Sequence, residues 1–190
     1  TFTANSADYG GGMKNVFNAN PQLVFCTFTD NSALYLGGGM LNVESSPSLN
    51  DCRFTENSAS SGGGMANLEY SAPILNYSVF MLNIADIGGG MYNLNSSPRL
   101  TYSSFVANSV SDLGGGIYNY YSSPLIDACT FANNSSAYLG GGIFNDTDSS
   151  PIITNSTIVL NTAIQFGGGM YNREAAPTIT NCTFWNNSAG

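Results

Sequence analysis

The sequence predicts an all-β protein, a right-handed parallel β-helix of about seven coils, each with about 26 residues and three short strands. First, a Gly-Gly-Gly triplet occurs seven times at spacings of 25 to 27 residues. Second, short pairs of residues alternate with the period of two that is typical of strands. Third, turn-forming residues separate these pairs. Of the 22 glycines, 21 lie in the triplets, which begin at Gly10, Gly37, Gly62, Gly88, Gly114, Gly140 and Gly167.

The first strand of each repeat follows the glycine triplet and reads Met or Ile, a variable residue, then Asn. Met or Ile and Asn point to the same face because alternate residues of a strand share a face. We expect the asparagines to form a ladder inside the coil, in which each amide hydrogen-bonds to the next coil. The Asn is present in all seven repeats, at Asn15, Asn42, Asn67, Asn93, Asn119, Asn145 and Asn172.

The second strand carries Pro-x-Leu or Pro-x-Ile, and the third carries Cys or Ser, one residue, and then Phe or Ile. We expect Met/Ile, Leu/Ile, Cys/Ser and Phe to point inward and form four columns, with each large buried side chain contributing about 1.5–3 kcal/mol. Three residues after each Phe or Ile an Asn recurs, from Asn5 to Asn187. These residues predict a second amide ladder.

Turns separate the three strands. Between Leu23 and Cys26 the spacing is three, so the alternation slips by one and indicates a bend. Asn and Asp often precede the Cys/Ser position, as at Asp51, Asn155 and Asn181, and both tolerate a left-handed backbone. The glycine triplets predict a further corner with positive φ. No segment has a helical pattern, and the hexapeptide repeat of the left-handed β-helix does not fit this period.

The four cysteines, Cys26, Cys52, Cys129 and Cys182, occupy the same position of the repeat, and Ser78, Ser103 and Ser156 occupy it elsewhere. Cys26 and Cys52 lie in adjacent repeats and could form a disulfide. In-register stacking holds side chains about 4.8 Å apart, which is longer than the usual Cβ separation in a disulfide. The interpretation favoured here is therefore small, buried, free thiols.

The repeats run from residue 1 to residue 190 without a linker, so a single repeat domain is expected. Thr1-Phe2-Thr3-Ala4-Asn5 and Thr183-Phe184-Trp185-Asn186-Asn187 have the same phase of the repeat. Solenoids normally carry caps on their terminal coils. The sequence contains no cap pattern, and we expect either a segment of a longer array or a subunit that stacks head to tail on other copies.

The composition and the hydrophobic pattern argue against binding to nucleic acid and against insertion into a membrane. Four cations and twelve acids leave a net charge of −8, and a nucleic-acid surface needs clustered Lys and Arg to neutralise phosphates. No apolar run is long enough for a transmembrane helix, so no membrane insertion is expected. Charged residues make up only 8% of the chain, while Ser, Thr and Asn are abundant. This composition favours an extracellular or cell-surface protein.

Phe-x-x-Asn paired with Gly-Gly-x-(Met/Ile), repeated along the whole chain, resembles the polymorphic outer-membrane protein repeat and, more broadly, right-handed parallel β-helix surface proteins. The resemblance implies a secreted or surface-displayed protein, often an adhesin or the passenger of an autotransporter. The third motif position is Gly here rather than Ala.

No catalytic, cofactor-binding or metal-binding residues are predicted. Polysaccharide lyases and hydrolases with this fold need clustered carboxylates, and the acids here are dispersed. Asp8, Asp86 and Asp112 precede the triplets, where turn chemistry explains them, and Asp146 and Asp148 are interpreted as solvated loop acids. We therefore expect a protein that is not an enzyme and has no cofactor.

One outward row suggests a binding surface. The variable residue between Met/Ile and Asn reads Lys14, Leu41, Ala66, Tyr92, Tyr118, Phe144 and Tyr171. We predict that Tyr92, Tyr118, Phe144 and Tyr171 form an exposed strip. The strip either shields the strand face by mutual stacking or docks a glycan, a host or cell-surface protein, or another copy of the chain. An ice-binding face would need a regular outward Thr-x-Thr array, which the sequence lacks.

Overall fold

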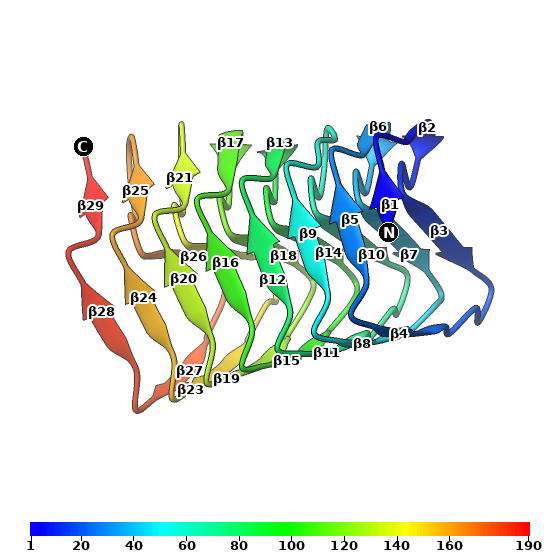
Figure 1. The fold of residues 1–190 in the computed structure, drawn as a ribbon. Coiled ribbons are helices and arrows are strands. Elements are labelled where there is room, and N and C mark those ends of the chain that lie inside the picture. The colour runs from blue at the N-terminus through cyan, green and yellow to red at the C-terminus, as the bar shows by residue number, and fades with distance from the viewer.

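The computed structural model describes all 190 residues and contains strands and turns but no helix. The chain winds into a right-handed β-solenoid of about seven turns, confirming the predicted fold class. Strands of successive coils lie side by side in parallel, and the two termini lie at opposite ends of the stack (Figure 1).

The Cys/Ser-x-Phe segments form an eight-stranded parallel sheet, here called the Phe sheet. The strands are β1 (Phe2–Thr3), β5 (Thr27–Thr29), β9 (Arg53–Thr55), β12 (Val79–Met81), β16 (Ser104–Val106), β20 (Thr130–Ala132), β24 (Thr157–Val159) and β28 (Thr183–Trp185). The Phe of each strand, or Ile158 in β24, points inward, and the residues on either side of it face outward.

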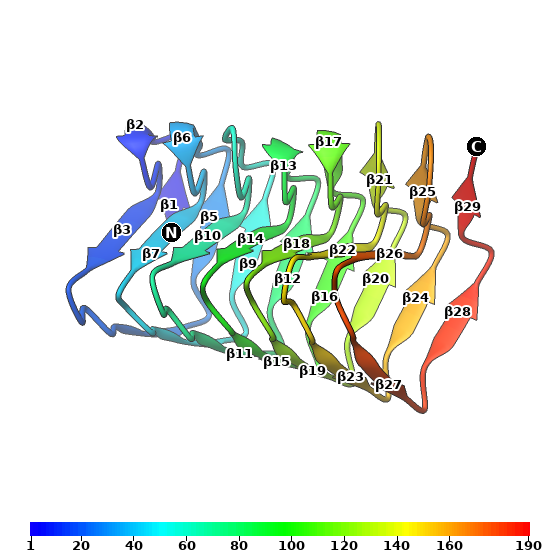
Figure 2. The same cartoon turned by 180° about the vertical axis from the view of Figure 1, so that it is seen from behind.

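The segments that follow the glycine triplets form a seven-stranded parallel sheet, the Asn sheet, whose strands are seen in order in Figure 2. The strands are β3 (Met13–Val16), β7 (Met40–Val43), β10 (Met65–Leu68), β14 (Met91–Leu94), β18 (Ile117–Tyr120), β22 (Ile143–Asp146) and β26 (Met170–Arg173).

The Pro-x-Leu segments form a second seven-stranded sheet, the Pro sheet. The proline precedes each strand, where its missing N–H costs no ladder hydrogen bond. The strands are β4 (Gln22–Val24), β8 (Ser48–Asn50), β11 (Ile74–Asn76), β15 (Arg99–Thr101), β19 (Leu125–Asp127), β23 (Ile152–Thr154) and β27 (Thr178–Thr180).

A fourth, short sheet precedes the glycine triplets and was not predicted. It consists of a pair of strands and a set of five, which are joined through isolated bridges at Ser58 and Ser61. Its small Ser and Ala residues lack the apolar alternation that marks the other strands. The strands are β2 (Ser6–Tyr9) and β6 (Ser32–Leu36), then β13 (Ile84–Ile87), β17 (Ser109–Leu113), β21 (Ser135–Ser136), β25 (Thr162–Ala163) and β29 (Ser188–Ala189).

Equivalent residues of successive coils lie directly opposite one another, and this register builds the core. Phe54 pairs with Phe28 and Phe80, and the Phe rings stack at centroid distances of 4.5 to 4.9 Å. A core of 19 buried residues contains the Met/Ile, Leu/Ile, Cys and Phe columns. Ser78, Ser103 and Ser156 are buried at the Cys position, so the four inward columns are confirmed.

Both predicted asparagine ladders are present. In the Asn sheet, each Nδ2 donates to the Oδ1 of the next coil at 2.8 or 2.9 Å, from Asn15 to Asn172. In the other ladder, the backbone N–H and Nδ2 of Asn57 both donate to Asn83 Oδ1 at 3.0 Å, and Nδ2 also donates to the Phe28 carbonyl at 2.9 Å. No buried side-chain nitrogen or oxygen lacks a partner.

Positive φ angles occur before the Cys/Ser position and in the glycine triplets, as predicted, and also at corners where none was predicted, such as Leu82 and Phe17. Asp51, Asn155 and Asn181 have φ between 51° and 52°. Only the first glycine of each triplet has positive φ, such as Gly88 at 61°. The second glycine is required by close packing, because a Cβ on Gly89 would lie 2.7 Å from the Gly115 carbonyl oxygen.

All four cysteines are free thiols. Burial raises the pKa of the Cys129 thiol to about 12, and it also raises the pKa of Cys52. A buried thiol with a high pKa is rarely a thiolate, so these residues serve as small apolar side chains in the core.

Candidate functional site

The predicted aromatic strip lies in register on the outer face of the Asn sheet. Tyr92, Tyr118, Phe144 and Tyr171 occupy the same position of β14, β18, β22 and β26. Successive ring centroids are 5.6, 5.1 and 5.4 Å apart. The rings therefore form the continuous outward column that alternation predicts.

The prediction that this column is exposed was wrong. Phe144 is completely buried and Tyr118 is 7% exposed, while Tyr92 and Tyr171 are half-buried. The segment before each glycine triplet folds back over the sheet and covers the rings, with Leu139 buried against them. Of the two interpretations, mutual stacking that shields the strand face describes the geometry.

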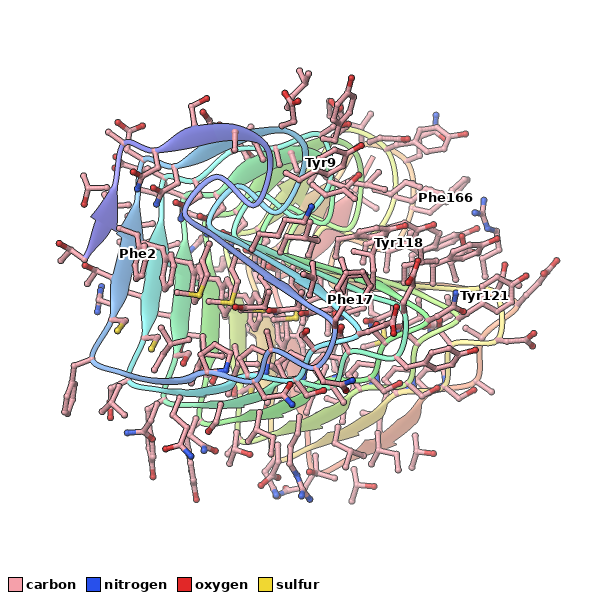
Figure 3. All side chains as sticks on the ribbon, turned by 90° about the vertical axis from the view of Figure 1, so that its right-hand side faces the viewer. Phe2, Tyr9, Phe17, Tyr118, Tyr121 and Phe166 are labelled. Atoms are coloured by element: carbon pink, nitrogen blue, oxygen red, sulfur yellow. The ribbon has the colours of Figure 1, made fainter.

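The covered space is a trough along the outer face of the Asn sheet, here called the outer trough. One wall is the segment before each triplet, which includes Tyr9 and Phe166, and the other is the corner after the Asn sheet, which includes Phe17 and Tyr121. Viewed along the stack, Tyr118 lies between these walls (Figure 3). The chain therefore has a second apolar layer outside the solenoid core.

A buried carboxylate lies within this layer. Asp146 Oδ2 accepts hydrogen bonds from Tyr118 Oη at 2.9 Å and from Arg173 Nη2 at 2.6 Å, and Oδ1 accepts one from Arg173 Nε at 2.8 Å. The guanidinium also lies 5.4 Å from the centre of the Phe144 ring. Asp146 is 1% exposed, so the prediction of a solvated loop acid was wrong for Asp146, while Asp148 is exposed.

The pKa values within this group reflect two opposing effects. Burial favours a higher pKa for Asp146, but the hydrogen bonds from Arg173 and Tyr118, with the Arg173 charge, outweigh it and hold the pKa below its ordinary range. Burial and the hydrogen bond to Asp146 raise the pKa of the Tyr118 phenol. Asp146 is therefore an ionised acceptor that fastens the sixth coil to the seventh.

The exposed aromatic residues lie elsewhere, at corners for which no binding surface was predicted. Tyr77 and Tyr102 follow β11 and β15, are more than half exposed, and stack with centroids 5.0 Å apart. The following corner position is the smaller Ala128. The sequence signal was available, because both tyrosines occupy the residue just before the Cys/Ser position.

Beside this tyrosine pair, the outer face of the Pro sheet is hollowed. The hollow has a volume of about 440 Å³ over β15, β19 and β23, and it contains Arg99 and Asp127. Asp127 accepts hydrogen bonds from Thr154 Oγ1 at 2.6 Å and from Asn155 Nδ2 at 2.7 Å, and these bonds lower its pKa. The hollow offers a cation, a carboxylate and hydroxyl groups to a polar ligand.

The other acids do not converge. Asp86 accepts hydrogen bonds from Ser60 at 2.9 Å and Ser111 at 2.8 Å, so it links neighbouring coils of the short sheet. No group of three or more His, Cys, Asp or Glu side chains is placed to hold a metal ion. The structure also contains no helix that could span a membrane.

The chain matches a known protein family. A family model described as a right handed beta helix region matches residues 83–190, which is more than half of the 190-residue chain. No curated protein and no solved structure matches the chain.

Proposed function

The chain belongs to the right-handed β-helix family, and on this premise we propose that it is an extracellular structural and adhesive β-helix. It acts either as a segment of a cell-surface protein or as a subunit that stacks head to tail into a filament. The observation that carries the proposal is the continuity of its ladders, which repeat the same residue pairs and hydrogen bonds from coil to coil.

The direction of the ladders supports head-to-tail stacking. In the Asn sheet every Nδ2 donates toward the C-terminal coil, from Asn15 to Asn42 at the start and from Asn145 to Asn172 at the end. A second copy stacked in the same direction, with its Phe2 on Phe184, would bring its Asn5 Oδ1 to the Nδ2 of Asn187 in the other ladder, which donates in the same direction. This stacking continues the eight-stranded Phe sheet and leaves one strand position unfilled in the seven-stranded Asn sheet.

Electron microscopy and light scattering of the purified protein test this assembly. We expect filaments or concentration-dependent oligomers, which Phe184→Lys abolishes because Phe184 ends the inward Phe column in β28. The matched control is Thr183→Lys, which places the same charge on the outward face of the same strand and leaves assembly intact. If the wild-type protein stays monomeric at all concentrations, the filament is excluded. The remaining alternative is then a segment of a cell-surface protein.

The extracellular location rests on composition and resemblance. The chain has few charges, abundant Ser, Thr and Asn, and motifs similar to the polymorphic outer-membrane protein repeat. Labelling of intact producing cells with a membrane-impermeant reagent tests it. Labelling only after lysis would contradict a surface role.

We also propose that the chain is not an enzyme. The support is that its one buried carboxylate, Asp146, is already held by Arg173 and Tyr118. A reducing-end assay on neutral and acidic polysaccharides tests this, and turnover proportional to protein concentration would contradict it.

A second candidate function is glycan binding at the hollow of the Pro sheet. Exposed tyrosines stack on sugar rings, and charged and hydroxyl side chains orient the hydroxyl groups of the sugar. Affinity electrophoresis in polysaccharide gels should show retardation that Tyr102→Ala removes and Tyr121→Ala does not, since Tyr121 lies at a different corner. Equal retardation of both variants would remove this candidate.

A further inference from the structure

The outer trough contains an aromatic column in one half of the molecule and side chains without rings in the other, where Leu41 and Ala66 are buried and Lys14 is exposed. From the fourth coil onward the aromatic column occupies it. In the first three coils the same positions are Lys14, Leu41 and Ala66, which have no rings. The trough here contains a groove of about 340 Å³, within the range of small-molecule sites.

The walls and floor of the groove are apolar. Val16 and Val43 form the floor, because they are the second outward residues of β3 and β7. Tyr9 and Leu36 line the side that precedes the glycine triplets, and Phe17 lines the opposite corner. Tyr9 and Phe17 lie on opposite sides of the trough in Figure 3.

The equivalent positions of the later coils indicate which side-chain shapes fit in the trough. Val43 lies in register with Leu68, Leu68 with Leu94, and Leu94 with Tyr120. Tyr120 packs against Tyr118, with ring centroids 6.4 Å apart. The same trough therefore accommodates flat aromatic rings where the sequence supplies them.

Lys14 gives the groove a charge. It is the only lysine of the chain, it is exposed, and its Nζ lies 5.2 Å from the centre of the Tyr9 ring. It has no carboxylate partner, because the single salt bridge joins Arg173 to Asp146. Glu69 lines the groove two coils away and disfavours an anion at that end.

We propose that this groove binds a small planar aromatic carboxylate. Its ring lies on Val16 and Val43 between Leu36 and Phe17, and its carboxylate pairs with Lys14 Nζ. This binding is independent of the extracellular structural role, because the groove lies on the outside of the solenoid and leaves the ladders untouched.

The probe for the test is 2-naphthoate, titrated into the full chain and followed by its fluorescence polarisation and by amide NMR shifts of the protein. We expect saturable binding to one site, with the largest shifts at Val16, Val43 and Leu68. Naphthalene-2-methanol, which keeps the ring and lacks the charge, should bind about fivefold more weakly, the scale of one exposed ion pair. Shifts centred on other coils, or no saturation, would overturn the proposal.

Three variants test whether binding is specific to the groove. Val43→Tyr supplies the ring that Tyr120 supplies in the fifth coil, so it should abolish binding of 2-naphthoate while the protein stays folded. Val106→Tyr makes the same change on the half-buried outer face of the Phe sheet and should leave binding unchanged. Lys14→Gln should remove the preference for the carboxylate over the alcohol. Binding that survives Val43→Tyr, or a preference that survives Lys14→Gln, would contradict the assignment.

Discussion

At the scale of single residues, buried polar side chains provide the specific bonds between coils. Asn119 accepts a hydrogen bond from Asn93 and donates one to Asn145, each at 2.8 Å, and it is fully buried. A buried amide must find partners because water cannot replace them. Each asparagine of the ladder therefore supplies hydrogen-bond partners to the amides of both neighbouring coils, and they supply partners to its own amide.

Replacing Asn119 with Leu should destabilise the fold. The change leaves Asn93 Nδ2 and Asn145 Oδ1 without partners in the core, which costs about 1–3 kcal/mol for each unsatisfied group. Urea denaturation measures the loss. Asn76→Leu, on the half-buried outward face of the Pro sheet, is the matched control and should change stability by much less. Equal effects of the two variants would contradict a role of the ladder in stability.

Asp146 should make stability depend on pH. Its pKa is lowered in the folded state, so its stabilising contribution is fully present above the unfolded pKa of about 3.9 and is lost as the pH falls through the folded value. In Arg173→Gln the burial of Asp146 is less opposed and its pKa rises. The variant should be less stable than the parent at pH 7, and this difference should shrink below about pH 4. Urea midpoints between pH 3 and pH 8 measure it, and a difference that is constant with pH would exclude Asp146 as the cause.

At the scale of elements, each strand has an inner and an outer packing role. The inner residues build the solenoid core, and on the Asn sheet the outer residues build the second apolar layer in the trough. The glycine triplets permit this layer, because the chain turns back over the sheet at a corner without side chains.

The burial of the aromatic column predicts that its residues stabilise the fold. Phe144→Ala should cost about 3–5 kcal/mol, the usual scale for a buried Phe. Tyr121→Ala, at an exposed corner, should cost far less. Thermal unfolding compares them, and a Phe144 variant that melts like the parent would show that the layer is dispensable.

The second glycine of a triplet should not tolerate a side chain. Gly89→Ala places a Cβ against the Gly115 carbonyl oxygen of the neighbouring coil, and backbone cannot yield there without shifting the stack. We expect a loss of about 1–3 kcal/mol or more, as for overpacking in a core. Ser58→Ala, at an exposed position, should be neutral in the same denaturation assay.

At the scale of the whole molecule, stability is a sum over similar coils and the contacts between them. Contacts join neighbouring coils in all four sheets, so no single coil is irreplaceable. The stack also orders the surfaces: the hollow, the groove and the corner tyrosines each extend over two or three coils.

Removal of one complete repeat should therefore leave a folded protein. Deletion of residues 91–116 joins Gly90 to Ile117. Because Ile117 occupies the same repeat position as Met91, this deletion preserves the phase of the repeat. We expect strand-rich circular dichroism and cooperative unfolding at a lower temperature, because one set of coil–coil contacts is lost. Deletion of residues 91–103 breaks the phase and should abolish folding. Two deletions with the same outcome would contradict the repeat model.

Sequence alone determined the fold class, the inward columns and both asparagine ladders. The reason is that similar repeats stack in register, so each position of the repeat becomes a column in the stack. The alternation within one repeat is therefore enough to predict which columns point inward. Met65, Phe54 and Asn119 all lie where their repeat positions predict. The short sheet was missed because its Ser and Ala residues are small on both faces and leave no alternating pattern.

Only the tertiary structure decided which outward residues meet solvent. Alternation correctly placed Tyr118 and Phe144 outside the coil, but it carries no information about a segment that folds back over them from before the next glycine triplet. The same covering buried Asp146 and paired it with Arg173, a residue 27 positions away. Outward in a strand and exposed in a protein are different properties, because exposure depends on every other part of the chain.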